Sequence, residues 1–291
     1  MDQELKTSCT IISRLQFPVF GSGFAKIFQQ ILRICLKIFT SPRSKPENFA
    51  TKTIMQKVLK RGILLPIEGT DGTGKKTQVK FLVDKLQTMG FGVVTVSFPQ
   101  YGKKSAGLVE EYLNGHYGAP DQVSPYAASL FFALDRFDAA PRITELLEAG
   151  YIIILDRYVD SNAGHQGGKI SDPEDRARFL AWLYDIEYNI LQVPKPNFVI
   201  ILHMPAEIGQ ALVAKKQERL YLERGTYDAH EADLKHLKNA EASYLWLAEK
   251  SPEDHRVVEC CDGERILTPE EVSAKISEIV EELLRKRKEG A

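Results

Sequence analysis

Five short apolar runs recur along the chain, and a segment with helical spacing of apolar residues follows each of them. The runs are near-continuously apolar, as expected for strands buried on both faces of a sheet; they are Gly62–Gly69, Phe91–Pro99, Tyr151–Tyr158, Asn197–Pro205 and His255–Cys261. The segments expected as helices are Lys75–Met89, Ser124–Ala149, Pro173–Leu191, Asp228–Lys250 and Pro269–Lys288. This alternation predicts an α/β fold of βαβ units, with right-handed crossovers and helices on both faces of a parallel sheet.

The pattern also predicts where chemistry should lie. Ligands of open parallel sheets bind at the carboxyl ends of the strands.

One residue of the first run is unusual for a central strand, because Pro66 lacks the N–H that a ladder needs. We therefore expect a local bulge at Pro66.

The first 54 residues differ in charge from the rest of the chain. Between Lys6 and Lys45 there are seven basic side chains and no acidic one. The apolar, cationic stretch Phe24–Phe39 fits a membrane-surface helix or a targeting peptide, whereas its internal charges make it a poor membrane span. The third interpretation is a plain upstream extension, with Met55 as an alternative start. We expect an extension over residues 1–54, possible organelle targeting included, and one folded domain over residues 55–291.

Net charge and cysteine spacing narrow the classes of function. The formal charge of -1 gives no general attraction to nucleic acid or membrane. The cysteines show no C-x-x-C metal spacing, and an adjacent pair rarely forms a disulfide; they are Cys9, Cys35, Cys260 and Cys261. The cysteines therefore make a reducing cytoplasm the simplest compartment. The near-neutral charge leads us to expect no nucleic-acid partner.

The stretch EGTDGTGKKTQ, from Glu68 to Gln78, has the G-x-x-x-x-G-K spacing of a phosphate-binding loop between a strand and a helix. Its glycines let backbone N–H groups and a helix N-terminus face an anion, and Lys75 adds a cation for phosphate oxygens. The ATP phosphates are expected to bind along this loop, at Gly69, Gly72, Thr73, Gly74, Lys75, Lys76 and Thr77.

Lys76 departs from the usual loop, which has a serine or threonine there to hold magnesium. A lysine cannot ligate Mg²⁺, and Thr77 lies about 100° further round the helix. Two interpretations stay open: either the metal is held through Asp156, at the end of the third run, or catalysis is weakened. A strand-end aspartate beside the loop favours the first.

Further chemistry follows the third run and lies in the second expected helix. Arg157 follows Asp156 and would face an acceptor phosphate. Phe132 and Arg136 are four residues apart on one helix face, where a ring suits a flat base and a guanidinium suits phosphate oxygens. Taken alone this pair is weak evidence, because a helical phenylalanine more often packs in the core and a helical arginine more often lies at a solvated edge.

Five motifs together resemble the thymidylate kinase family of P-loop nucleoside monophosphate kinases. They are EGTDGTGKKTQ, SFPQYG, FFALDR, DRYVDSNAGHQGG and AEASYLWLA, and they span Glu68 to Ala248. The resemblance implies transfer of the ATP γ-phosphoryl group to dTMP, with Mg²⁺, in a five-stranded three-layer fold with a short lid. It also implies a homodimer.

The resemblance assigns roles to single residues. Asp71 corresponds to the acid that contacts the sugar 3′-hydroxyl of dTMP, and Phe132 to the ring that stacks on thymine, with Phe98 lining the same pocket. The remaining acceptor positions are two phosphate ligands and two groups around the thymine and sugar, namely Arg136, Arg157, Asn162 and Gln166. The resemblance further implies a lid over about residues 215–227, with Arg219 as its cation before an aromatic-containing turn.

Three departures leave the activity open at this stage. Lys76, Tyr101 and His165 differ from residues common at these positions in the family. The leading interpretation is a dTMP kinase. The alternatives are a kinase for another pyrimidine monophosphate and a nucleotide-binding protein with weakened turnover.

Overall fold

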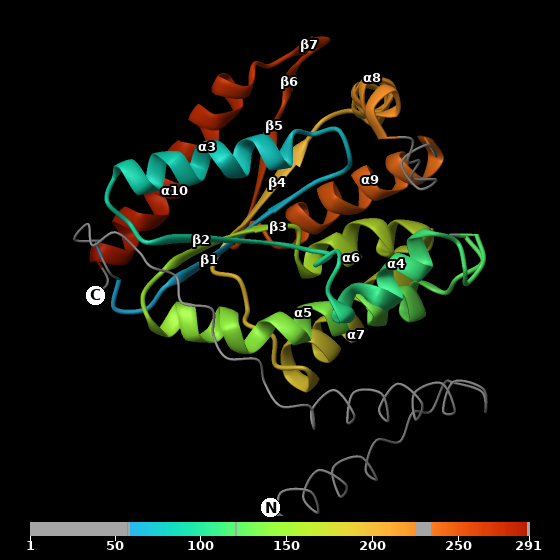
Figure 1. Ribbon diagram of the computed structural model, residues 1–291, viewed down its shortest axis with the longest axis horizontal. Coiled ribbons are helices and arrows are strands. Elements are labelled where there is room, and N and C mark those ends of the chain that lie inside the picture. The colour runs from blue at the N-terminus through green and yellow to red at the C-terminus, as the bar shows by residue number, and fades with distance from the viewer. Residues whose placement is uncertain (1–56, 58, 120, 225–233, 290–291) are drawn as a thin grey trace, which may run out of the picture. The chain divides into compact units, whose positions relative to one another are not determined.

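The central feature of the structure is one five-stranded parallel sheet (Figure 1). A computed structural model describes residues 57, 59–119, 121–224 and 234–289, so the expected extension over residues 1–54 lies outside the described residues. The strand order is β2-β3-β1-β4-β5, and the strands are β1 (Ile63–Glu68), β2 (Val93–Ser97), β3 (Ile152–Asp156), β4 (Val199–His203) and β5 (His255–Glu259). All five fall inside the five apolar runs, so the predicted α/β class is confirmed.

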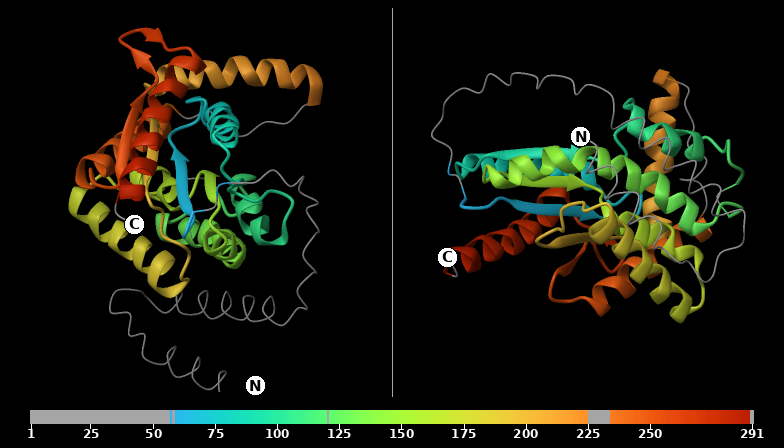
Figure 2. Two further views of the ribbon diagram at one scale, coloured as in Figure 1. Left: turned by 90° about the vertical axis from the view of Figure 1, so that its left-hand side faces the viewer. Right: turned by 90° about the horizontal axis from the view of Figure 1, so that it is seen from below.

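Helices cover both faces of this sheet. In Figure 1, α3 (Lys75–Thr88) and α10 (Pro269–Glu289) lie on one side, and α5 (Pro125–Glu148) and α7 (Pro173–Tyr184) lie on the other. Figure 2 shows the same layers from two further directions. The remaining helices are α4 (Gly107–Leu113), α6 (Val159–His165), α8 (Ala206–Arg224) and α9 (Leu234–Lys250), and a small hairpin pairs β6 (Cys261–Asp262) with β7 (Arg265–Ile266).

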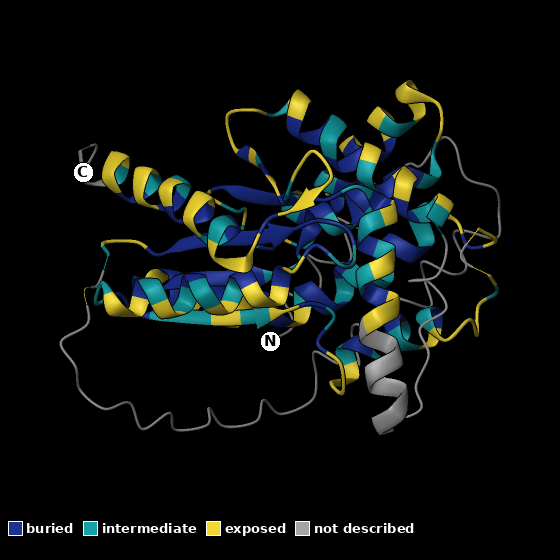
Figure 3. Ribbon diagram, turned by 90° about the horizontal axis from the view of Figure 1, so that it is seen from above, coloured by how far each residue is buried: buried dark blue, intermediate teal, exposed yellow. Residues whose placement is uncertain are grey.

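Two apolar layers hold the sheet and helices together. Side chains alternate along β1, so Leu65 packs in the layer beneath α3 and α10, while Leu64 packs in the layer beneath α5 and α7. Figure 3 shows the central strands β1, β3 and β4 buried, whereas the edge strands β2 and β5 are partly exposed and the outer helix faces are exposed. No described helix is long and apolar enough to cross a membrane.

Pro66 does not cause the expected bulge. The register between β1 and β3 is unbroken from Ile63↔Ile152 to Ile67↔Asp156. On the other side, β1 pairs with β4 only from Ile67 onward, and the Leu64 N–H donates instead to Asn197 Oδ1 at 2.8 Å. The missing N–H of Pro66 is therefore accommodated because the β1–β4 ladder begins only after this residue. The prediction of a bulge was wrong.

Three helices were not expected from the sequence, namely α4, α6 and α8. The turn expected after Arg219 is wrong, because α8 continues through it to Arg224. The physical reason is that the segment after Gly209 consists mainly of strong helix formers with no glycine or proline. The side chain of Arg219 and residues 225–233 lie outside the described residues, and the described part of the next helix begins at Leu234 rather than near Asp228.

A buried histidine at the start of β5 makes the stability of the fold depend on pH. His255 Nε2 lies 2.9 Å from Asp160 Oδ2, and its Nδ1 lies 2.5 Å from Asp254 Oδ1. Burial alone would lower the pKa of His255, but Asp160 and Asp254 raise it to about 9. Because this exceeds the unfolded value of about 6.5, the stabilisation is fully present below pH 6.5 and is lost as pH rises through 9.

We expect the free energy of unfolding to fall by about 3 kcal/mol more between pH 6.5 and pH 9.5 in the native protein than in His255→Gln. Urea unfolding at a series of pH values measures both slopes. Parallel slopes in the two proteins would show that His255 is not charged in the folded state.

Candidate active site

A tight loop follows β1 and leads into α3 at the carboxyl edge of the sheet. Gly69 has φ +133°, and a Cβ there would lie 2.4 Å from Leu202 O of β4. Gly72 has φ +86°, and a Cβ there would lie 2.3 Å from Gly209 O of α8. Only glycine fits at either position, so the loop keeps close contact with both neighbours. Gly74 is the left-handed cap before α3, which turns the helix N-terminus toward the loop.

The Lys75 ammonium lies across this loop. Its Nζ donates to Gly69 O at 3.0 Å and to Thr70 O at 2.8 Å, and it is 4.0 Å from Asp71 Oδ1. Burial and the nearby Arg157 lower the pKa of Lys75 to about 8, against the opposing pull of Asp71. A buried cation beside backbone N–H groups and a helix N-terminus is suited to binding phosphate.

Arg157 and Asp71 form an ion pair next to Lys75. Arg157 Nη2 donates to Asp71 Oδ1, and its Nη1 lies 3.3 Å from Gly69 O. Burial would raise the pKa of Asp71, but Arg157 and Lys75 hold it well below its usual range. Arg157 has φ +69°, a left-handed conformation that is costly for a residue with a side chain. The structure thus brings three predicted site residues into contact.

The residues considered for holding the metal differ in their position and exposure. Lys76 and Thr77 are both exposed on the first turn of α3. Asp156 ends β3 and is partly exposed, and within the described part of the chain no group donates a hydrogen bond to its carboxylate. A carboxylate with uncommitted oxygens at the sheet edge fits an oxygen-preferring ion such as Mg²⁺. The described residues contain no cluster of three or more histidine, cysteine or acidic ligands, so phosphate and water would supply the other oxygens.

The predicted acceptor residues lie on α5 and α6, with Phe98 just after β2. Phe98 is buried 5.8 Å from the Tyr158 ring, and Phe132 meets the Tyr112 ring edge-on at 6.1 Å. Asn162 Nδ2 donates to Ser129 O at 3.1 Å, which ties α6 to α5. Two buried atoms of this region, Gln166 Oε1 and Ser129 Oγ, have no hydrogen-bond partner among the described residues. Such atoms suit the polar edge of a ligand.

Arg136 differs from Arg157, the other predicted ligand of the acceptor phosphate, because both members of its ion pair are almost fully buried. Its Nε lies 3.0 and 3.1 Å from the two carboxylate oxygens of Glu187, and its Nη2 also donates to Glu187. Its Nη1 donates to Tyr158 O at 3.1 Å, directly after Arg157. Each terminal nitrogen keeps a second hydrogen, so the guanidinium has donors left for a ligand.

Two buried acids shape the site without having been identified from the sequence. Glu68 accepts from the Tyr158 N–H at 2.6 Å, the Ser161 hydroxyl at 2.7 Å and the Tyr244 hydroxyl at 3.0 Å. This carboxylate therefore joins the ends of β1, α6 and α9. Its sequence signal was an acidic residue directly after an apolar run.

Asp135 plays a similar role for the loop after β2. Its Oδ2 accepts from the Gln100 N–H at 2.7 Å, and its Oδ1 accepts from the Ser105 hydroxyl at 2.6 Å. Gln100 Oε1 in turn accepts from Lys103 Nζ at 2.6 Å. The aspartate of FFALDR thus fixes the SFPQYG loop beside the acceptor residues.

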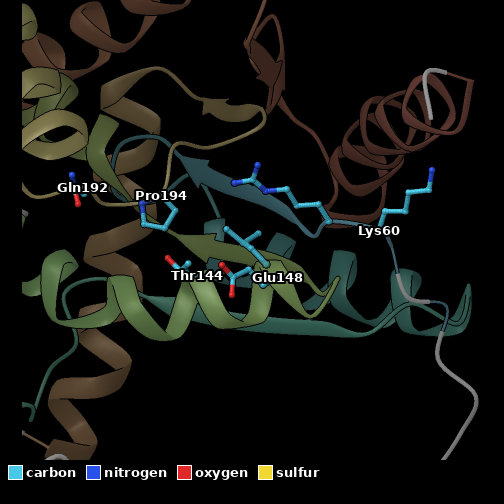
Figure 4. A pocket seen from close by; sticks show the side chains of 7 residues that line it. Lys60, Thr144, Glu148, Gln192 and Pro194 are labelled. Atoms are coloured by element: carbon cyan, nitrogen blue, oxygen red, sulfur yellow. The ribbon is translucent and has the colours of Figure 1, made fainter.

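A cavity of about 600 Å³ lies elsewhere in the fold. Lys60 and Arg61, which precede β1, line it together with Thr144 and Glu148 at the end of α5, as the close-up in Figure 4 shows. These residues mark the amino edge of the sheet. The cavity is therefore distinct from the phosphate loop, which lies at the carboxyl edge.

Comparisons with known proteins agree with this geometry. A family model described as thymidylate kinase matches residues 67–259. A thymidylate kinase of Mycobacterium tuberculosis is 37% identical over 148 residues, which cover 50% of this chain and 68% of that protein. One of Caulobacter vibrioides is 30% identical over 221 residues, covering 76% and 96%. A solved thymidylate kinase from Candida albicans superposes with a TM-score of 0.55 at 25% identity, covering 76% of this chain and 92% of that one.

Proposed function

The chain belongs to the thymidylate kinase family, and from this membership we propose how its site transfers the γ-phosphoryl group of ATP to dTMP to form dTDP. It is a nucleoside monophosphate kinase, a phosphotransferase of deoxynucleotide synthesis. The observation that carries the proposal is the contact between the phosphate loop and Arg157, through Asp71 and Gly69 O. This contact supports a donor-phosphate site and a cation for the acceptor phosphate that lie side by side.

Catalysis in this arrangement consists of positioning and charge neutralisation. The backbone N–H groups of the loop and Lys75 would bind the donor phosphates, while Arg157 would neutralise the acceptor phosphate. Asp71 would accept a hydrogen bond from the sugar 3′-hydroxyl, and Phe132 would stack on the base. No side chain with a tuned pKa has to remove a proton, because phosphoryl transfer depends mainly on fixed geometry and electrostatics.

Magnesium is part of this proposal. Asp156 would hold the ion, directly or through water, and the ion would neutralise charge on the phosphates. Lys76 is exposed rather than buried with the loop lysine, which leaves room for a metal held without a residue-76 ligand. Arg219 and the other cations near the end of α8 remain candidates for closing over ATP.

One assay tests both which nucleotide accepts the phosphoryl group and how Lys76 affects turnover. Purified protein with ATP and Mg²⁺ is given dTMP, dUMP or no acceptor, and nucleoside diphosphates are separated by chromatography. We expect dTDP as the preferred product, and we expect Lys76→Thr to change kcat by less than about threefold, because Asp156 rather than residue 76 provides the metal contact. Turnover by the Lys76→Thr variant alone would instead identify a nucleotide-binding relative without native catalysis.

Assembly and compartment belong to the same proposal. We propose a homodimer that uses apolar surface of α5, including Phe131 and Leu134, both of which are partly buried in the single chain. The thiols of Cys260 and Cys261 are free, which suits a reducing cytoplasm. Sedimentation of the purified protein at micromolar concentration distinguishes a dimer from a monomer.

A further inference from the structure

Two histidines lie edge to edge beside Arg157. His165 is the last residue of α6, and His236 lies in the first turn of the described α9. Their ring centroids are 5.4 Å apart at an interplanar angle of 23°, and His165 Nδ1 lies 3.2 Å from His236 Nε2. The other nitrogen of His165, Nε2, lies 3.1 Å from Arg157 Nη1. The edge of His165 also meets the Tyr244 ring at 5.9 Å and 88°.

These contacts determine which ring nitrogen carries the hydrogen. A guanidinium can only donate, so Arg157 donates to His165 Nε2, which must be the bare nitrogen. The hydrogen of a neutral His165 is then on Nδ1, where it donates to Nε2 of His236. Burial and then the charge of Arg157 lower the pKa of His165 well below its usual range, so the ring is neutral. The charged or titratable groups that face it besides Arg157 are Asp71, His236 and Lys75.

The chain of hydrogen bonds therefore runs from Arg157 through His165 to His236. On its other side, the Arg157 guanidinium is held by Asp71. A guanidinium fixed between a carboxylate and a neutral imidazole keeps one orientation despite the strained backbone at φ +69°. Without an acceptor at residue 236, the Nδ1–H of His165 loses its partner, and the ring gains by turning away from Arg157 toward another acceptor.

We propose that His236 is a positioning residue for the acceptor phosphate, which acts by holding the His165 ring through its Nδ1–H and thereby the orientation of Arg157. This inference rests on the proposed role of Arg157 as a ligand of the dTMP phosphate. His236 touches no reacting group in this arrangement, and its effect on the reaction passes through the two hydrogen bonds of His165. The consequence is a specific dependence of dTMP binding on the acceptor atom at residue 236.

The kinetic test compares His236→Phe with His236→Gln. Phenylalanine keeps a flat ring at this position but removes the acceptor, whereas glutamine keeps an acceptor oxygen. We expect His236→Phe to raise KM for dTMP about tenfold with kcat changed less than about threefold, as for loss of one hydrogen bond that orients bound substrate. His236→Gln is expected to stay within about threefold of the native KM. The matched control is His116→Phe, at an exposed histidine paired with Glu111, which should leave KM unchanged.

A second measurement does not depend on kinase activity. Long-range ¹⁵N–¹H correlation spectra of histidine-labelled native protein, without nucleotide, report the tautomer of His165. The proposal expects a hydrogen-bonded Nδ1–H in the native protein and in His236→Gln, and loss or broadening of that Nδ1–H signal in His236→Phe. An Nε2–H tautomer in the native protein overturns the inference, as does an equal KM for dTMP in His236→Phe and His236→Gln. If the spectra agree but dTMP is not phosphorylated, the proposed function fails while the tautomer assignment stands.

Discussion

Replacing Lys75 by methionine is expected to lower kcat/KM for ATP by about 10³-fold while the protein stays folded. Lys75 is buried, and its ammonium is bonded to the carbonyls of Gly69 and Thr70 at the loop where the donor phosphates would bind. Methionine has a similar length and no charge, so it removes the cation without leaving a large void. Steady-state kinetics gives the ratio, and thermal unfolding checks the fold.

The pKa of Lys75 adds a second signature to this prediction. Because burial and Arg157 lower that pKa to about 8, the free protein loses the ammonium as pH rises through 8. ATP affinity of the native protein should therefore fall above pH 8, and that fall should be absent in Lys75→Met. The matched control is Lys76→Met, since Lys76 is the exposed neighbour. An equal loss of activity in the two variants would argue against a special role for the buried lysine.

The sheet and most of the layers were predictable because buried parallel strands leave a strong local signal. Each of the five apolar runs contains one strand, and Pro173–Leu191 covers α7 together with the π-helical turn Asp185–Ile190. The helices that were missed are of two kinds. α4 and α6 are each seven residues long, too short for an apolar period to show, and α8 mixes apolar and polar residues without a clear apolar stripe.

Within the site, the predicted residues that the structure brings into contact belong to local motifs. The loop residues and Arg157 lie within two short motifs, and the structure brings them into contact. Reasoning from the sequence could not find partners that are distant in the chain. Glu187 is 51 positions from Arg136, and His236 is 71 positions from His165. Pairings at such separations are set by how α5, α6, α7 and α9 pack, and a single sequence does not record that packing.

Substitution of Glu187 by glutamine is expected to reduce the free energy of unfolding by about 3 to 5 kcal/mol. Glu187 and Arg136 are 0% and 1% exposed, so the amide leaves the guanidinium buried without a compensating charge. The residue lies in the π-helical turn Asp185–Ile190, which aims the carboxylate at α5. Urea unfolding measures the loss, and Glu145→Gln serves as the matched control, because Glu145 forms an exposed pair with Arg142 and should cost less than about 1 kcal/mol.

A double variant separates the structural part of this pair from its part in binding. Arg136→Met combined with Glu187→Met removes both charges, so much of the lost stability should return, since paired apolar residues often replace a buried ion pair without loss. If the free N–H groups of Arg136 contact dTMP as the family resemblance implies, the double variant should fold yet bind dTMP at least about tenfold more weakly, measured by calorimetry without ATP. Native dTMP affinity in the folded double variant would assign Arg136 to the scaffold alone, where it holds Tyr158 O and the chain next to Arg157.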